Sequence, residues 1–164
     1  MVRNKTFHNL DSAKTIGILF NATSEQDYQA GKELVYQLMD MGKSVDSIGF
    51  VELQENIGKY VITSNMNFFA LQQKGFFMLP KEIQVVEEFV SQKFDMLINV
   101  SPVENIMVDY IMSLSKASFK ISPGLQNDDF ADFIINFSSK NTLTSKAIIA
   151  KVKEYLTLLD KQKN

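Results

Sequence analysis

Short runs in which every residue or nearly every residue is apolar recur along this sequence, and they alternate with segments of helical periodicity. The first run spans residues 15–20 and reads Thr-Ile-Gly-Ile-Leu-Phe. Strands of this kind are typical of a parallel sheet that helices cover on both faces. Apolar residues then recur at helical spacing between positions 30 and 41, and residues 44–50 read as a second strand. The first 50 residues therefore predict a right-handed βαβ unit.

The rest of the chain continues this alternation. Further strands are predicted at residues 59–63, 76–79, 94–100, 119–121 and 132–137; a helical turn is predicted at 66–71, and helices at 83–90 (opened by Pro80), 106–114 and 148–159. Such an order favours an α/β fold, an open, mostly parallel, Rossmann-like sheet of five or six strands with helices on both faces. One domain over residues 15–160 is expected, after a loose or peripheral segment over residues 1–14.

Composition excludes several chemistries. Cysteine is absent from the 164 residues, which removes disulfides, cysteine nucleophiles and thiolate metal sites. His8 is the only histidine and lies near one end, so a Ser-His-Asp triad would have to recruit it from the terminal segment. No catalytic residue is assigned, and the balance leans against an enzyme.

Phosphate-binding and metal-binding motifs are present only in part. Gly42-Lys43-Ser44 lacks the earlier glycine of a phosphate loop and lies between a helix and a strand, in the wrong order. The loop after the first strand has no glycine, so a dinucleotide cofactor is not expected. Asp128, Asp129 and Asp132 could hold a hard cation, but a turn and a strand entry explain them better. No cofactor and no metal are predicted.

The formal net charge of −2 argues against a general attraction to nucleic acid or anionic membrane. Arg3 is the only arginine, and the six lysines of residues 140–164 read as solvated charges on a closing helix. No run of about 18 apolar residues occurs, and the N-terminus lacks the apolar core of a signal peptide. We expect a cytoplasmic protein that binds neither nucleic acid nor membrane.

Three predicted strands end in the same way, with asparagine followed two residues later by a hydroxyl residue. The pairs are Asn21 with Thr23, Asn99 with Ser101, and Asn136 with Ser138. In a parallel sheet these pairs lie at the carboxyl edge, where open α/β sheets bind ligands. Neutral amides and hydroxyls suit a sugar, an amide or a nucleoside. The competing interpretation is local, because these residue types also end strands and cap helices.

The segments 94–99 and 111–121, with the runs 16–20 and 132–135 and the Tyr155-Leu156 pair, resemble a bacterial family of about 165 residues and unknown function. That resemblance implies an α/β fold and carries over no catalytic residue. A fainter similarity, to the N-terminal half of heptosyltransferase-like glycosyltransferases, implies contact with an acceptor sugar.

Three functions remain open at this point. The first is a binding domain for a small polar ligand or a protein partner, with the six rim residues as its site. The second is a transferase acting on a sugar or nucleotide, with Asp95 or Asp132 as a base. Both aspartates begin strands, however, and so should lie at the edge opposite the asparagines. The third is self-assembly into a homo-oligomer through the region from Phe68 to Phe77.

Overall fold

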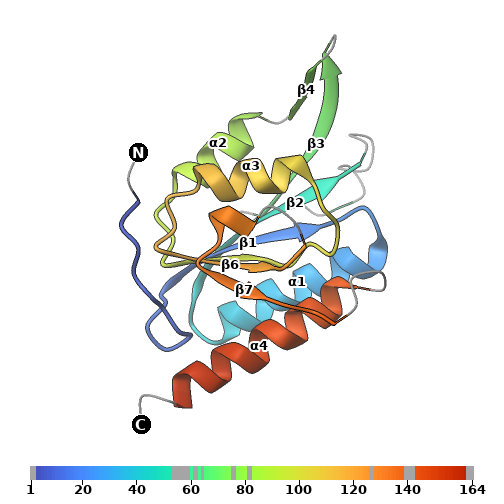
Figure 1. Ribbon diagram of the computed structural model, residues 1–164. Coiled ribbons are helices and arrows are strands. Elements are labelled where there is room, and N and C mark those ends of the chain that lie inside the picture. The colour runs from blue at the N-terminus through green and yellow to red at the C-terminus, as the bar shows by residue number, and fades with distance from the viewer. Residues whose placement is uncertain are drawn as a thin grey trace.

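The computed structural model describes residues 3–52, 60, 63, 65–74, 77–80, 83–125, 128–138 and 143–161 (Figure 1). Its strands are β1 (Thr15–Asn21), β2 (Ser44–Val51), β3 (Met66–Lys74), β4 (Phe77–Pro80), β5 (Met96–Asn99), β6 (Phe119–Pro123) and β7 (Phe133–Ile135). Its helices are α1 (Glu25–Asp40), α2 (Ile83–Ser91), α3 (Ile106–Leu114) and α4 (Ser145–Lys161), with a short 3₁₀ helix, η2 (Asp128–Phe130).

The strands form one open sheet in the order β4-β3-β2-β1-β5-β6-β7. All neighbouring pairs are parallel except β3 with β4, which is antiparallel and lies at one edge. The predicted α/β class and the mostly parallel sheet are confirmed. The six parallel strands match the upper end of the predicted number, and β4 adds a seventh.

Helices cover both faces of the sheet (Figure 1). The face under α1 and α4 buries the alternate β1 residues Ile16, Ile18 and Phe20. The opposite face, under α2 and α3, buries Leu19 of β1 together with Leu97 of β5. Because neighbouring strand residues point to opposite faces, a sheet with two cores needs apolar residues at nearly every position. This explains the continuous apolar runs of the sequence.

Two predictions around β3 are wrong. Residues 66–71 belong to a strand rather than a helical turn, because Phe68 and Phe69 alternate between the two cores. Pro80 does not open a helix, since it ends β4 and α2 begins at Ile83. An edge strand tolerates a proline, which has no N–H to donate. The strand predicted at 59–63 lies mostly outside the described residues.

Residues 3–13 run along the amino ends of the strands and are tied to them. The Thr6 N–H donates to Ser118 O at 3.1 Å, and the rings of Phe7 and Phe119 meet edge to face at 5.1 Å. Further along, Lys43 Nζ donates to the carbonyls of Leu10 and Ala13. The segment is peripheral to the sheet, and these contacts anchor it.

We predict that Gly31→Ala destabilises the protein, although alanine is the better helix former. In an open helix this change would stabilise by about 1 kcal/mol. Here a Cβ at position 31 of α1 would lie 2.6 Å from the ring of the buried Phe20. Overpacking of this kind costs roughly 1–3 kcal/mol in the free energy of unfolding, which urea denaturation measures. A more stable Gly31→Ala variant would contradict the close packing of α1 on β1.

Candidate functional site

The chain order of the sheet reverses between β1 and β5. From β1 the chain crosses to β2 on one side, whereas β5 lies on the other side of β1. Loops that leave the carboxyl ends of such a strand pair diverge and leave a crevice, which is where open α/β sheets bind ligands. The residues that follow β1 and β5 therefore surround the expected position of a site.

Asn21 ends β1 and is buried at this edge. Its Nδ2 donates to Thr23 Oγ1 at 2.8 Å and to Asp27 Oδ2 at 3.1 Å. Its Oδ1 is buried and has no hydrogen-bond partner among the described residues. The Nδ2 group of Asn21 therefore stabilises the turn into α1, whereas its Oδ1 acceptor is not used by that turn.

Asp27 joins the starts of two helices. Ser24, the N-cap of α1, donates from its hydroxyl to Asp27 Oδ2 at 2.8 Å, and the Ser145 N–H of α4 reaches Oδ1 at 3.3 Å. Burial alone would raise the pKa of Asp27, but hydrogen bonds from Ser145, Ser24 and Asn21 outweigh it and lower that pKa. The carboxylate stays ionised at two helix N-termini, where negative charge is favoured.

Asn99 ends β5 and shapes the next loop. Its Oδ1 accepts the Ser101 N–H at 2.9 Å, a local Asx-type turn. Its Nδ2 lies 3.5 Å from Ser122 Oγ in β6, which is a long hydrogen bond. Ser101 is buried and donates to Val103 O at 3.1 Å. The Asn99 amide thus retains a weakly engaged donor that faces β6.

The third pair lies farther out. Asn136 and Ser138 follow β7 and are exposed, as is Thr23. The Asn136 side chain rests on Gly124, where an added Cβ would lie 2.6 Å from its Oδ1. β6 separates β7 from β5. All three pairs thus lie at the carboxyl edge, spread over separate strands of the sheet.

A cavity of about 250 Å³ opens between the ends of β5 and β6 and the start of α3. Its lining residues are Asn99, Val103, Glu104, Asn105, Ile106, Val108, Asp109, Ser122, Pro123 and Leu125. Of the six residues that the sequence singled out, Asn99 alone belongs to this described lining. The three asparagines therefore do not meet in this cavity.

The cavity's other polar residues lie outside the rim predicted from the sequence. Asn105 is the N-cap of α3 and accepts the Met107 N–H at 2.8 Å, a role that an asparagine before an apolar helical stripe signals. Ser122 lies inside a strand, and only the pairing of β5 with β6 brings it opposite Asn99. No local pattern marks it.

Carboxylates and neutral polar groups line the cavity. Glu104 is exposed at its rim and Asp109 is partly exposed, and no basic side chain belongs to the described lining. An anion such as phosphate would meet like charge there. The cavity suits a small neutral or cationic ligand.

At the opposite edge of the sheet, where the strands begin, two aspartate side chains bind backbone N–H groups. Asp95 accepts the N–H groups of Lys14 and Thr15 at 2.8 and 3.0 Å, and hydrogen bonds from their N–H groups lower its pKa despite its burial. Asp132 accepts the Lys120 N–H at 2.9 Å. Both aspartates therefore lie opposite the asparagines, as expected, and hold the starts of strands.

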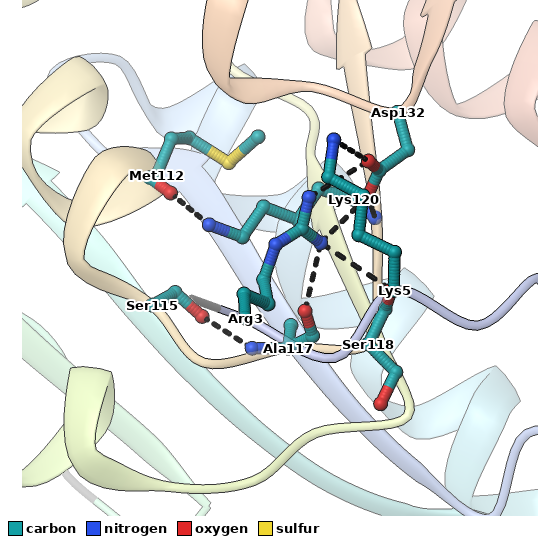
Figure 2. Close-up of polar contacts among 8 residues, drawn as sticks. All are labelled: Arg3, Lys5, Met112, Ser115, Ala117, Ser118, Lys120 and Asp132. Carbon is teal, nitrogen blue, oxygen red and sulfur yellow. Dashed lines mark hydrogen bonds and ion pairs between the residues drawn. The ribbon is translucent and has the colours of Figure 1, made fainter. Parts of the chain in front are cut away.

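Figure 2 shows that Arg3 brings the N-terminal segment onto Asp132. Its guanidinium contacts the two carboxylate oxygens at 2.6 and 2.7 Å and also donates to Ala117 O at 2.9 Å. Lys5 reaches the same carboxylate at 3.1 Å from solvent. Burial would raise the pKa of Asp132, but the bonds from Arg3, Lys5 and the Lys120 N–H lower it.

Lys120 is buried beside this ion pair, and its Nζ donates to Met112 O in the last turn of α3 (Figure 2). Burial, with a smaller effect from the Arg3 charge, lowers its pKa from 10.5 to about 8. The ammonium satisfies a carbonyl that the end of the helix leaves without an intrahelical donor. This hydrogen bond gives the buried lysine a structural role.

In the described part of the chain, no cluster of three or more histidine and carboxylate groups could hold a metal ion. Across the same residues, no helix has both the length and the apolar character needed to cross a membrane. The cytoplasmic location stays a prediction.

Together, the switch point, the crossover helices and the cavity at the carboxyl edge define a small open α/β protein of Rossmann-like arrangement. The chain belongs to the family of unknown function DUF6913, whose model matches residues 1–159. This confirms the resemblance to a family without an assigned function; the glycosyltransferase similarity is not shown. No match was found among curated proteins.

We predict that Arg3→Met costs more stability than Lys5→Met, although both remove a cation from Asp132. Arg3 is mostly buried, with 14% of its side chain exposed, whereas Lys5 is 69% exposed. Hydrogen bonds to buried charges contribute roughly 1.5–3 kcal/mol, and exposed ion pairs about 0–1 kcal/mol. Urea denaturation at neutral pH measures both losses.

The Arg3 effect also has a pH signature. The pKa of Asp132 is lower in the folded state than in the unfolded chain. The stabilisation that Arg3 provides is therefore fully present above the ordinary aspartate pKa, and it is lost as the pH falls through the lowered pKa. Equal losses for the two variants at neutral pH would contradict the anchoring role of Arg3.

We predict that Lys120 makes stability rise with pH in alkaline solution. Between pH about 8 and 10.5 the unfolded chain holds a proton that the folded chain has released, so raising the pH favours folding. The free energy of unfolding of the wild type should therefore rise relative to that of Lys120→Met as the pH increases across this window. Parallel pH profiles of stability for the two proteins would show that burial does not lower the pKa of Lys120.

Proposed function

We propose that this protein is a binding domain for a small polar ligand, a neutral polyol or an amine, held in the cavity between β5, β6 and α3. One observation carries the proposal: the cavity lies beside the topological switch point and combines a weakly engaged amide donor with hydroxyl, amide and carboxylate groups. Small-molecule sites favour such positions, with a few polar groups among apolar walls.

Size and charge narrow the ligand class. A volume of about 250 Å³ lies just below the roughly 300–1,000 Å³ of drug-sized sites, so it suits a monosaccharide or small amine rather than a dinucleotide. The exposed carboxylate of Glu104 at the rim disfavours phosphates and therefore nucleotide sugars. The polar groups offer hydrogen bonds to hydroxyl and ammonium groups.

The transferase alternative has less support. Asp95 and Asp132, its candidate bases, are engaged with backbone N–H groups at the far edge of the sheet. The self-assembly alternative based on residues 68–77 also loses support, because Phe68 and Phe69 are core residues. Position 76 lies outside the described residues. A protein partner at the same carboxyl edge remains the second candidate.

The test is a thermal-shift titration with D-glucose, D-ribose, glycerol and ethanolamine, with inorganic phosphate and AMP as anionic controls. A ligand at 100 times its dissociation constant stabilises the folded state by about 2.7 kcal/mol, which shifts the melting temperature by several degrees. We expect a shift with at least one polyol or amine. A response to phosphate or AMP alone would contradict the ligand class.

Variants at Asn99 locate the site and separate the two ligand types. Asn99→Asp retains the oxygen that accepts the Ser101 N–H but removes the amide donor, so polyol binding should weaken roughly 3- to 10-fold. Binding of an amine should hold or strengthen. Asn136→Ala is the matched control, because it removes an asparagine at the same sheet edge outside the cavity lining. Unchanged affinity in Asn99→Asp for every ligand would exclude this cavity.

A further inference from the structure

α3 carries an apolar stripe on its outer surface, separate from its buried side. Ile106, Tyr110 and Leu114 follow one another at four-residue spacing, so they lie along one flank of the helix. Their exposed fractions are 74%, 45% and 47%. A row of large exposed apolar side chains at this spacing is typical of a surface that another protein covers.

The exposed apolar surface extends beyond α3. Phe130 of η2, which packs against α3, is 40% exposed. Ile134 of the edge strand β7 is 39% exposed and points away from the core that holds its neighbours Phe133 and Ile135. Ile134 therefore lies on the face of the sheet that α3 covers.

The residues around α3 are arranged symmetrically about Tyr110. Ile106 and Leu114 lie four positions before and after it, and the exposed charges Glu104 and Lys116 lie six positions before and after it. Two copies of α3 packed antiparallel across a two-fold axis at Tyr110 would set Ile106 against the other copy's Leu114. The same arrangement would set Glu104 near the other copy's Lys116.

We propose that this surface binds a second copy of the same chain, forming a two-fold dimer through α3. A two-fold interface uses the same patch on both subunits, so the patch must be complementary to itself. The apolar stripe with an acidic group at one end and a basic group at the other meets this condition. Antiparallel packing also sets the positive end of each helix dipole near the negative end of the other.

The dimer surface and the ligand cavity overlap only in part. Tyr110 and Leu114 do not belong to the described cavity lining, and Asn99 and Ser122 do not belong to the stripe. Dimerisation and ligand binding can therefore fail separately. The two share Glu104 and Ile106, so the dimer partner would approach the mouth of the cavity.

Sedimentation velocity over a concentration series tests the dimer. We expect the wild type to approach twice the mass of one chain as concentration rises. Tyr110→Glu puts two like charges at the axis and Leu114→Glu puts a charge against Ile106, so both variants should remain monomeric. Two matched controls, Tyr36→Glu on α1 and Leu158→Glu on α4, change residues of nearly equal exposure, 45% and 48%, and should dimerise like the wild type.

Charge reversal tests the register. Lys116→Glu would place two acidic groups together at each end of the interface and should raise the dimer dissociation constant about tenfold, because two ion pairs become repulsive. Combining it with Glu104→Lys should restore the wild-type value. A wild type that stays monomeric at every concentration overturns the proposal. So does a Tyr110→Glu variant that still dimerises, or a failure of the double variant to recover.

Discussion

The architecture depends on the burial of β1. This strand is hydrogen-bonded to a parallel neighbour on each side, β2 and β5, and lies between two apolar cores. Space around it is so limited that a Cβ at Gly17 would lie 2.8 Å from the Phe94 ring. Parallel neighbours require crossover connections, and a strand with an apolar core on each side requires helices on both faces of the sheet.

The two edges of the sheet consequently differ in chemistry. At the amino edge, Asp95 and Asp132 bind the N–H groups that begin strands, and Arg3 brings the N-terminal segment onto Asp132. Hydrogen bonds from backbone N–H groups lower the pKa of both aspartates despite their burial, and the pKa of Asp132 is lowered also by its contacts with Arg3 and Lys5. At the carboxyl edge, loops diverge around a cavity with neutral and acidic groups. The proposed binding site therefore lies at the carboxyl edge, while the contacts at the amino edge stabilise the fold.

Polar residues at strand ends can serve local structure and a ligand at once. Asn21 and Asn99 both organise the turn that follows their strands, which is the local interpretation of their pattern. Yet each retains a group that the turn does not use: the buried Oδ1 of Asn21 and the weakly bonded Nδ2 of Asn99. Only the second belongs to the cavity. The position of each asparagine in the sheet, rather than its residue type, therefore decides whether its remaining donor or acceptor lines the cavity.

The sequence by itself determined the class of fold, because a sheet with two cores demands apolar residues at successive positions and crossover helices demand a helical stripe between strands. It also indicated which ends of the strands carry the amides and which carry the aspartates. It could not reveal the partner of Asp132, because Arg3 lies 129 positions away and the pairing depends on how the N-terminal segment crosses the sheet. Nor could it predict that Ser122 faces Asn99 while Asn136 lies apart, since strand order is decided by packing between elements distant in the chain. The prediction of a helical turn at residues 66–71 is wrong for the same reason. Phe68 and Phe69 point into different cores, and the positions of those cores are known only from the folded structure.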